Sequence, residues 1–233
     1  MTAAVGRALV LADGMPPTRA GLDAAWPGWD DGVDHVVAAD GGARLAPVLG
    51  VRLDRWVGDG DSLTSDEIAR LEAAGVAIRR VPQAKDESDT ELALLEALEV
   101  SADVAILGAL GGGRIDHTIA NLGLLAHPAL LNCSARLLDD TARVTLLQAH
   151  GQEARATSMA RLEGRIGDIV SLLPVGDGVE GVTTENLEYP LRDEPLPAGP
   201  ARGLSNVRTA AIATVRIRAG RLLIVESPAT LNR

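Results

Sequence analysis

Phenylalanine is absent from the sequence, tyrosine occurs once, and aromatic residues make up only 2% of the 233 residues. Extensive aromatic stacking on a ligand is therefore excluded. The sequence is also poor in positive charge, with 22 Lys and Arg against 32 Asp and Glu and a formal net charge of −10. This balance argues against a general nucleic-acid-binding or anionic-membrane surface. An anionic substrate would need a local cluster of basic side chains, backbone N–H groups or a metal ion.

Cysteine and long apolar runs are scarce as well. Cys133 is the only cysteine, so no intrachain disulfide can form and a reducing compartment is the natural location. The apolar run 8–12 near the N-terminus is too short for a signal peptide or a membrane span. We therefore expect a cytoplasmic protein with no membrane or nucleic-acid partner.

Several common catalytic motifs are missing. The chain has no G-x-x-x-x-G-K-[ST] motif, which excludes a P-loop enzyme, and Gly111-x-Gly113 is not completed to G-x-G-x-x-G. Closely spaced histidines, clustered cysteines and a G-x-S-x-G motif are also absent, which argues against zinc and serine hydrolases.

The apolar residues that are present, chiefly Leu, Val, Ile and Ala, suffice for one large domain or two modest ones. In the first part, strand-like runs alternate with helical patterns that begin near Thr64 and Ser88 and at Ile115. The expected strands cover 7–11, 33–39, 55–57, 76–81, 104–107 and 135–138. This alternation predicts an α/β domain over residues 1–149, with a mostly parallel, Rossmann-like sheet flanked by helices.

From residue 150 the pattern becomes strand-like and predicts a smaller antiparallel β domain over 150–233. Residues 213–218 alternate apolar and polar side chains, and Ala219-Gly220 suggests a tight turn into a partner strand at 221–225. We expect a turn at 174–178 and an irregular loop at 192–203, because both segments are rich in Pro and Gly.

Asp59 and Asp61 follow the expected strand 55–57. Ligands of parallel α/β sheets bind beyond the carboxyl ends of the strands, and paired carboxylates there suit a hydrated Mg²⁺ ion that is shared with phosphates. A polar turn capped by Ser62 would explain the same residues. An EF-hand loop is excluded, because Leu63 stands where an oxygen ligand is needed.

A second acidic turn contains Lys85, Ser88 and Asp89. Ser88 can cap the following helix, and Asp89 in the first helical turn meets the helix dipole favourably. The functional interpretation adds that Asp89 faces the metal of Asp59 and Asp61, while Lys85 contacts a phosphate. Both interpretations hold together, because helix N-termini also bind anions.

The Gly108–Gly113 segment is the most specific feature. Glycines let a backbone approach a phosphate chain closely, and Arg114 supplies a planar fork of donors for phosphate oxygens. Asp116 falls in the first helical turn, near the metal or the nucleophile. We expect His117 to serve helix packing rather than catalysis, and Asn121 can satisfy buried polar groups.

Together these segments resemble the thiamine pyrophosphokinase family in their order and spacing. The resemblance spans nearly the whole chain, and it rests on the following motifs: Asp40-Gly41-Gly42-Ala43, Gly58-Asp59-Gly60-Asp61-Ser62, Lys85-Asp86-Glu87-Ser88-Asp89, Gly112-Gly113-Arg114-Ile115-Asp116-His117 with Asn121, Tyr189, Ser205-Asn206 and Gly220–Ile224. Gly60 replaces a bulky aromatic residue and Ser88 replaces a threonine that are usual in the family.

The resemblance implies Mg²⁺-dependent transfer of a pyrophosphoryl group from ATP to the hydroxyl of thiamine, which gives thiamine diphosphate and AMP. It also implies a homodimer with thiamine bound near the subunit interface. The implied metal ligands are Asp59, Asp61 and Asp89, and these three, with Arg114 and Asp116, form the expected catalytic set. The expected nucleotide and phosphate contacts are Asp40, Lys85, Ser88, Gly112, Gly113 and Arg114. Ser205 and Asn206 would bind thiamine.

Two alternatives are compatible with the residues. A Mg²⁺-dependent phosphohydrolase also uses acidic pairs at strand ends, and it would release phosphate or diphosphate without an acceptor. A non-catalytic nucleotide or thiamine sensor on the same fold would bind ligands without forming AMP.

Overall fold

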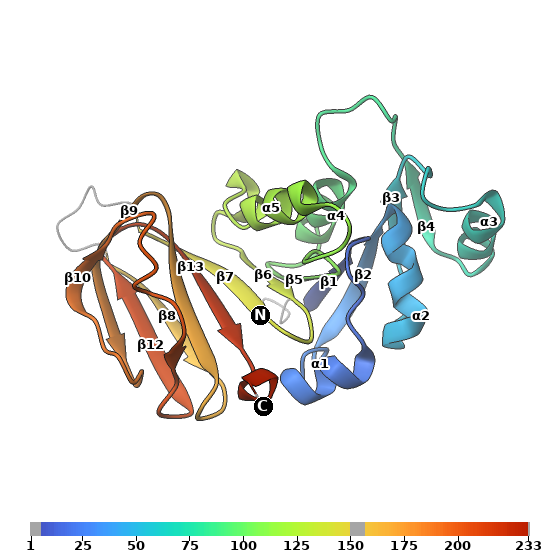
Figure 1. Ribbon diagram of the computed structural model, residues 1–233. Helices are drawn as coiled ribbons and strands as arrows, with labels where there is room; N and C mark the ends of the chain where they lie inside the picture. Colours follow the sequence, from blue (N-terminus) through green and yellow to red (C-terminus); the bar gives the residue numbers. More distant parts are fainter. Residues whose placement is uncertain (1–5, 150–156, 233) are drawn as a thin grey trace, which may run out of the picture. The chain divides into compact units, whose positions relative to one another are not determined.

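The structure is a computed structural model that describes residues 6–149 and 157–232 (Figure 1). Its contacts divide the chain into two units, residues 1–140 and 141–233. The division precedes the boundary that we predicted between residues 149 and 150, because the strand Arg143–Ala149 pairs with a strand of the second unit. Residues 150–156, where the predicted second domain begins, lie outside the described residues.

The first unit contains a six-stranded parallel sheet in the order β4-β3-β2-β1-β5-β6. Its strands are β1 (Arg7–Leu11), β2 (Val33–Ala39), β3 (Arg55–Gly58), β4 (Ala77–Arg80), β5 (Asp103–Leu107) and β6 (Ser134–Leu138). The predicted parallel sheet is thus confirmed. Its strand order changes direction at β1, since the chain builds outward to β4 on one side and then returns to place β5 on the other.

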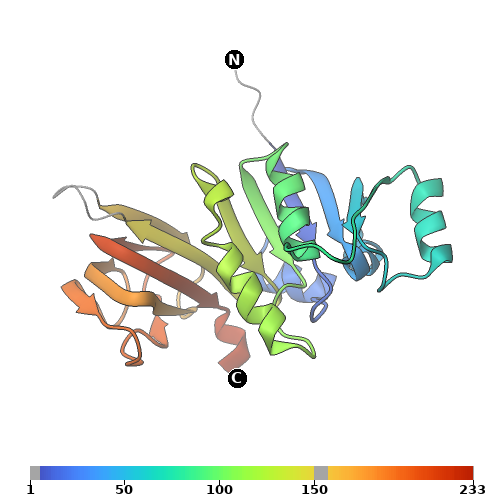
Figure 2. The same ribbon diagram turned by 90° about the horizontal axis from the view of Figure 1, so that it is seen from above.

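The connections are helical, and helices lie on both sides of the sheet (Figures 1 and 2). They are α1 (Arg19–Ala25), η1 (Asp40–Arg44), α2 (Leu45–Leu49), α3 (Ser65–Ala73), α4 (Asp89–Leu98), α5 (Ile115–Leu124) and η2 (Pro128–Leu130). The helix expected near Thr64 is α3, and Thr64 and Glu67 form a capping box at its start. Ser88 caps α4 as predicted, because its side chain accepts a hydrogen bond from the backbone N–H of Glu91.

The core of the first unit is aliphatic, apart from its tryptophans. Leu9 and Leu11 of β1 share one buried cluster with Trp56 of β3 and Leu22 of α1. The helix α4 packs across β1, β2, β3 and β5. Because it lies over the middle of the sheet, its buried surface is wide: Leu92 is buried, and Leu94 and Ala97 are fully buried.

The second unit is antiparallel, with strand order β7-β13-β9-β12-β8, and β10 and β11 pair with β9. Its elements are β7 (Arg143–Ala149), β8 (Ser158–Glu163), β9 (Ile169–Glu185), β10 (Arg192–Leu196), β11 (Asn206–Val207), β12 (Ile212–Ile217), β13 (Ala219–Ser227) and η3 (Ala229–Asn232). The expected antiparallel character is confirmed.

Three local predictions in this unit are wrong. The expected turn at 174–178 lies within the continuous strand β9, where Gly176 and Gly178 adopt positive φ and bend the strand without ending it. The expected loop 192–203 begins with β10, which pairs irregularly with β9. Finally, β12 and β13 do not form a hairpin. Both pair antiparallel with β9, first β12 beside 183–185 and then β13 beside 169–180, so the chain keeps its direction past Arg218.

No helix within the described part of the chain combines the length and the apolar character that a bilayer crossing requires.

Candidate functional site

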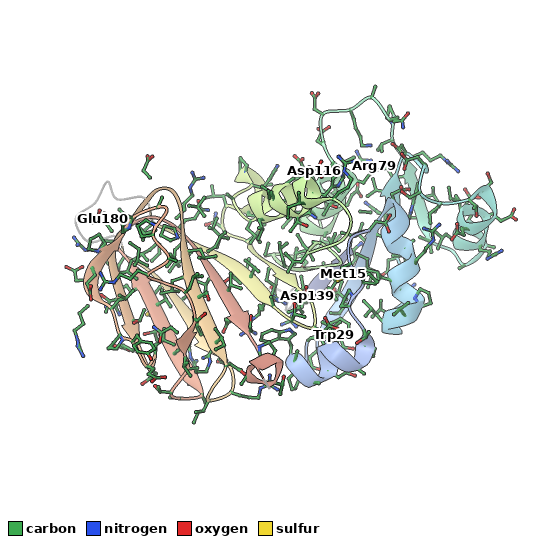
Figure 3. All side chains as sticks on the ribbon, in the orientation of Figure 1. Met15, Trp29, Arg79, Asp116, Asp139 and Glu180 are labelled. Atoms are coloured by element: carbon green, nitrogen blue, oxygen red, sulfur yellow. The ribbon has the colours of Figure 1, made fainter. Side chains whose placement is uncertain are left out.

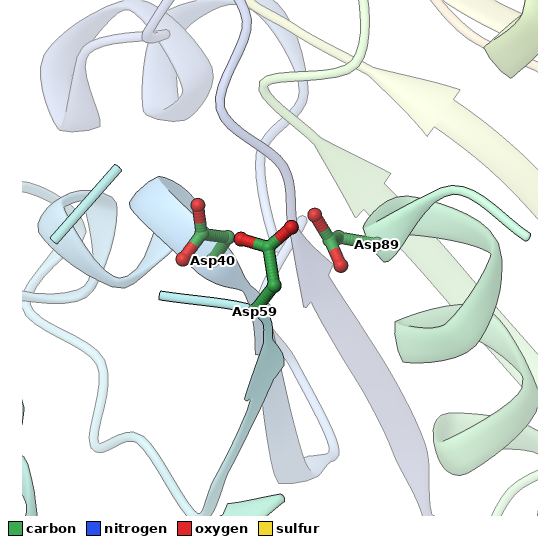
Figure 4. Close-up of side chains that lie close together, drawn as sticks. All are labelled: Asp40, Asp59 and Asp89. Atoms are coloured by element: carbon green, nitrogen blue, oxygen red, sulfur yellow. The ribbon is translucent and has the colours of Figure 1, made fainter. Parts of the chain in front are cut away.

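Three carboxylates converge at the carboxyl ends of the central strands (Figure 4). Asp40 begins η1 directly after β2, Asp59 follows β3, and Asp89 is the first residue of α4. One oxygen of each side chain lies within 4.8 Å of the others. The parallel sheet produces this convergence, because it brings the ends of β2 and β3 to the same edge.

Asp40 is the most buried of the three, with only 4% of its surface exposed. It is held in a left-handed conformation with φ of 40°, which is uncommon for a residue other than glycine and often occurs at functional sites. Its Oδ2 accepts a hydrogen bond of 3.1 Å from the backbone N–H of Ser62, whereas its buried Oδ1 has no partner. Burial raises the pKa of Asp40, and the neighbouring Asp89 and Asp61 raise it further.

Asp61, which the family resemblance implies as a metal ligand, lies next to the cluster of three carboxylates and is not one of its members. Its backbone N–H donates to Oδ1 of Asp59 at 3.0 Å, and its own Oδ1 accepts from the Ser62 hydroxyl at 3.1 Å. Asp61 lines the adjacent cavity, yet the cluster of three carboxylates contains Asp40 instead. The family resemblance implies nucleotide binding for Asp40. Asp40 follows the end of a predicted strand, and this position in the sequence also indicates a possible metal ligand.

Gly60 explains how the turn between the two acids is made. Its φ of 82° is readily available only to glycine. A Cβ at this position would lie 3.2 Å from Nη1 of Arg80 and 3.3 Å from Cδ1 of Ile68. Neighbouring side chains therefore already fill the space beside this turn.

Lys85 provides the positive charge of the cluster. Its Nζ lies 3.0 Å from Oδ1 of Asp89 and 3.8 Å from Oδ2 of Asp59. Although burial lowers the pKa of Lys85, the hydrogen bond and the charge of Asp89 outweigh it, and the pKa is raised. The lysine is thus a fixed cation at the edge of the site.

A cavity of about 490 Å³ adjoins these residues. Its lining brings together all six predicted nucleotide and phosphate contacts, which are Asp40, Lys85, Ser88, Gly112, Gly113 and Arg114. Other residues of the lining are Asp13, Asp61, Asp89, Gly111, His117 and Asn121. Gly112 has φ of 92° and approaches the backbone of Gly14. The loop is held from α5 by Asn121, whose Nδ2 donates to the carbonyl of Ala109 at 2.9 Å.

Arg114 is the N-cap residue of α5, and Asp116, labelled in Figure 3, lies in the first turn of that helix. Arg114 reaches the cavity, and its guanidinium forms an ion pair with Asp116. The hydrogen bond from Arg114 lowers the pKa of Asp116. Asp116 is exposed and is not among the cavity-lining residues, so its contact in this structure is with the arginine rather than with the three carboxylates.

The remaining predicted residues belong to the second unit. Ser205 is exposed and has φ of 55°. Asn206 is buried, and its side chain accepts from the backbone N–H of Tyr189 at 2.9 Å and donates to the Tyr189 carbonyl at 2.7 Å. These bonds fix the backbone of Tyr189, whose side chain remains 65% exposed.

The donor set of Asp40, Asp59 and Asp89 fits a hard divalent cation. Oxygen ligands from carboxylates suit Mg²⁺, which is usually bound by one or two carboxylates together with substrate phosphates. The unpartnered, buried Oδ1 of Asp40 is a further indication, because buried polar atoms rarely lack a partner.

Comparison with known proteins gives a consistent result for both units. Residues 29–137 match the family model "Thiamin pyrophosphokinase, catalytic domain", and residues 159–222 match "Thiamin pyrophosphokinase, vitamin B1 binding domain". A thiamine pyrophosphokinase of Bacillus subtilis is 27% identical over 170 residues, which cover 73% of this chain and 76% of that protein.

Solved structures show the same fold. The structure of a thiamin pyrophosphokinase family protein from Enterococcus faecalis is 26% identical, with a TM-score of 0.77 over 95% of this chain and 99% of the other. The Bacillus subtilis enzyme structure has a TM-score of 0.78 at 24% identity, covering 95% of this chain and 98% of that one. The yeast enzyme structure has a TM-score of 0.74 at 16% identity, covering 97% and 88%.

Proposed function

This chain belongs to the thiamin pyrophosphokinase family, and we propose that the cavity beside Asp40, Asp59 and Asp89 is where it binds ATP. The activity of the chain is ATP-dependent transfer of a pyrophosphoryl group to thiamine. In this reaction the hydroxyl oxygen of thiamine bonds to the β-phosphorus while the bond from that phosphorus to the oxygen of the departing AMP breaks. The observation that carries the placement is the convergence of three carboxylates beside a glycine loop.

Asp40, Asp59 and Asp89 would hold Mg²⁺, which supplies charge neutralisation on the phosphate oxygens when bound. Asp61 is the fourth acid of the site. Its N–H bond to Asp59 orients that carboxylate, and it lines the cavity itself. The proposed ligand set therefore differs from the sequence-based expectation by the addition of Asp40, with Asp61 in a supporting position.

The phosphates would lie along the Gly108–Gly113 loop, between Lys85 and Arg114. Backbone N–H groups of glycine loops suit phosphate oxygens, and the two cationic side chains can neutralise charge that develops during transfer. This placement corresponds to a Rossmann-like binding mode beyond the carboxyl ends of the strands. Ser88 lines the same cavity from the N-terminus of α4, and Asp116 would orient Arg114 through their ion pair.

Thiamine would bind to the second unit, through Ser205 and Tyr189. Asn206 would act indirectly, because its amide is already occupied by the backbone of Tyr189. Tyr189 is the only aromatic residue of this unit, and its exposed ring could stack on a ring of the substrate.

Replacing Tyr189 by alanine is expected to raise KM for thiamine by about 3- to 10-fold, because one aromatic contact contributes roughly 0.5–1.5 kcal/mol. The KM for ATP should not change. Steady-state kinetics with each substrate varied in turn measure both values. Tyr189→Phe is the matched control and should retain the wild-type KM for thiamine, since it keeps the ring. An unchanged KM in Tyr189→Ala would remove the ring from the thiamine site.

We also propose a homodimer, as the family resemblance implies. Ile115 and Ile119 of α5 are exposed one helical turn apart, with 72% and 62% of their surface accessible. Contiguous exposed apolar surface marks contacts between proteins, and these two side chains would contribute to such a surface. Light scattering coupled to size exclusion should give twice the mass of the 24.2 kDa chain, and a monomer mass at micromolar concentration would contradict the proposal.

One product analysis distinguishes the transferase from its alternatives. With ATP, Mg²⁺ and thiamine, we expect equal amounts of AMP and thiamine diphosphate, and no AMP when thiamine is omitted. Release of phosphate or diphosphate without thiamine would indicate a phosphohydrolase. Binding without any product would indicate a sensor.

A further inference from the structure

Ser62 is held on both sides by one short helix. Its backbone N–H donates to Oδ2 of Asp40 at 3.1 Å, and its carbonyl accepts from Nη2 of Arg44 at 2.8 Å. Asp40 and Arg44 are the first and last residues of η1. The segment that supplies one proposed metal ligand therefore also fixes the end of the loop that supplies another, Asp59.

Arg44 is itself fixed by Glu67 of α3. Its Nε lies 2.8 Å from Oε1 and its Nη2 lies 3.0 Å from Oε2, which is a two-pronged ion pair. Glu67 also accepts the backbone N–H of Thr64 at 2.8 Å and its hydroxyl at 2.9 Å. The hydrogen bond from Arg44, together with those from Thr64, lowers the pKa of Glu67 to about 2, so it is a carboxylate at neutral pH.

We infer that Arg44 is a positioning residue that holds the Asp59–Ser62 loop against Asp40 and so sets the geometry of the three carboxylates. The inference rests on the proposed metal site. Arg44 is not among the residues that line the cavity, so its effect would pass through Ser62. Lysine cannot replace it, because one ammonium group cannot bond in the same plane to a carbonyl and to both oxygens of a carboxylate.

The test measures binding of Mn²⁺ by calorimetry without nucleotide, alongside the thermal unfolding midpoint. Groups that orient metal-binding side chains typically contribute about 10- to 100-fold in metal affinity. We expect Arg44→Ala to weaken Mn²⁺ binding by about 10-fold, and Arg44→Lys to restore little of it. Glu67→Gln should have a smaller effect in the same direction, because the bond from Arg44 to Ser62 remains.

Arg19 offers a matched control in the same unit. It donates to the carbonyl of Leu49 at 3.0 Å and forms ion pairs with Asp23 and Asp30, but it has no contact with the loop. Arg19→Ala should bind Mn²⁺ like the wild type.

Three results would overturn the inference. The first is wild-type Mn²⁺ affinity in Arg44→Ala, even with a lower unfolding midpoint, because it would assign Arg44 to stability alone. The second is wild-type Mn²⁺ affinity in Arg44→Lys, because it would show that only the positive charge of Arg44 matters. The third result applies if Arg44→Ala does not fold. In that case, wild-type Mn²⁺ affinity in both Glu67→Gln and Arg44→Lys would overturn the inference. A wild-type protein that binds no Mn²⁺ would instead refute the proposed metal site, and the inference with it.

Discussion

Asp89→Asn is expected to lower kcat/KM for thiamine diphosphate formation by about two to three orders of magnitude. Asp89 belongs to the carboxylate cluster and lies 3.0 Å from Lys85. Its loss would remove a proposed metal ligand and the partner of a cation that would contact phosphate. Removal of one electrostatic contact to developing charge typically costs about 10²- to 10³-fold. Steady-state kinetics with saturating ATP and Mg²⁺ measure the effect.

The fold should survive this substitution. Asparagine has nearly the same volume, and the cap of α4 comes from Ser88, which is unchanged. Asp86→Asn is the matched control, because it removes the same charge from an exposed residue of the same turn, and it should retain activity within about threefold. Turnover near the wild-type level in a folded Asp89→Asn protein would exclude Asp89 from the site.

Arg208→Met is expected to destabilise the second unit by about 3–5 kcal/mol. Arg208 is 1% exposed; its Nη2 donates to Oε1 of Glu226 at 2.5 Å and its Nη1 to the carbonyl of Leu162 at 2.6 Å. Burial lowers the pKa of Arg208, but the surrounding carboxylates keep the guanidinium paired. Removal of one partner from a buried ion pair leaves the other, here Glu226, without full compensation.

Urea unfolding can separate the two units. All three tryptophans, Trp26, Trp29 and Trp56, belong to the first unit, so their fluorescence reports its unfolding, while far-ultraviolet circular dichroism also follows the β-rich second unit. Arg208→Met should shift the transition seen by circular dichroism. Arg216→Met, at an exposed position of β12, should change stability by less than about 0.5 kcal/mol. A similarly small change in Arg208→Met would show that this buried pair contributes little.

Local sequence patterns were sufficient to predict much of the secondary structure of the first unit. The strands 7–11 and 33–39 were predicted with the bounds that the structure has, because both are mostly apolar and each is followed closely by an Asp-Gly pair that ends it. The caps at Thr64 and Ser88 were equally predictable, since a cap depends only on residues within one helical turn.

Long-range pairing was less predictable in the second unit. The spacing of 213–218 and 221–225 suggested a hairpin, but both strands pair with β9, which lies far away in sequence. Glycines at 176 and 178 suggested a turn, although they bend a strand whose neighbours continue past them. Sequence spacing does not specify which edge a strand will join.

Prediction of the site required both local motifs and long-range contacts. Motif order identified the glycine loop and the acidic turns, yet the geometry of the carboxylate cluster depends on the positive φ of Asp40 and Gly60. These two turns direct Asp40 toward Asp59 and Asp89 and leave Asp61 beside them. The Asp40 turn is held by long-range hydrogen bonds, from Trp56 to its carbonyl and from Ser62 to its carboxylate, which no local pattern encodes.

We propose that Asp40, Asp59 and Asp89 bind one divalent cation beside the phosphate loop. Anomalous diffraction from crystals grown with Mn²⁺ and a non-hydrolysable ATP analogue tests it most directly. We expect one strong Mn²⁺ peak coordinated by oxygens of these three carboxylates and of the triphosphate. A peak coordinated by Asp61 without Asp40, or bound triphosphate with no metal at this cluster, would contradict it.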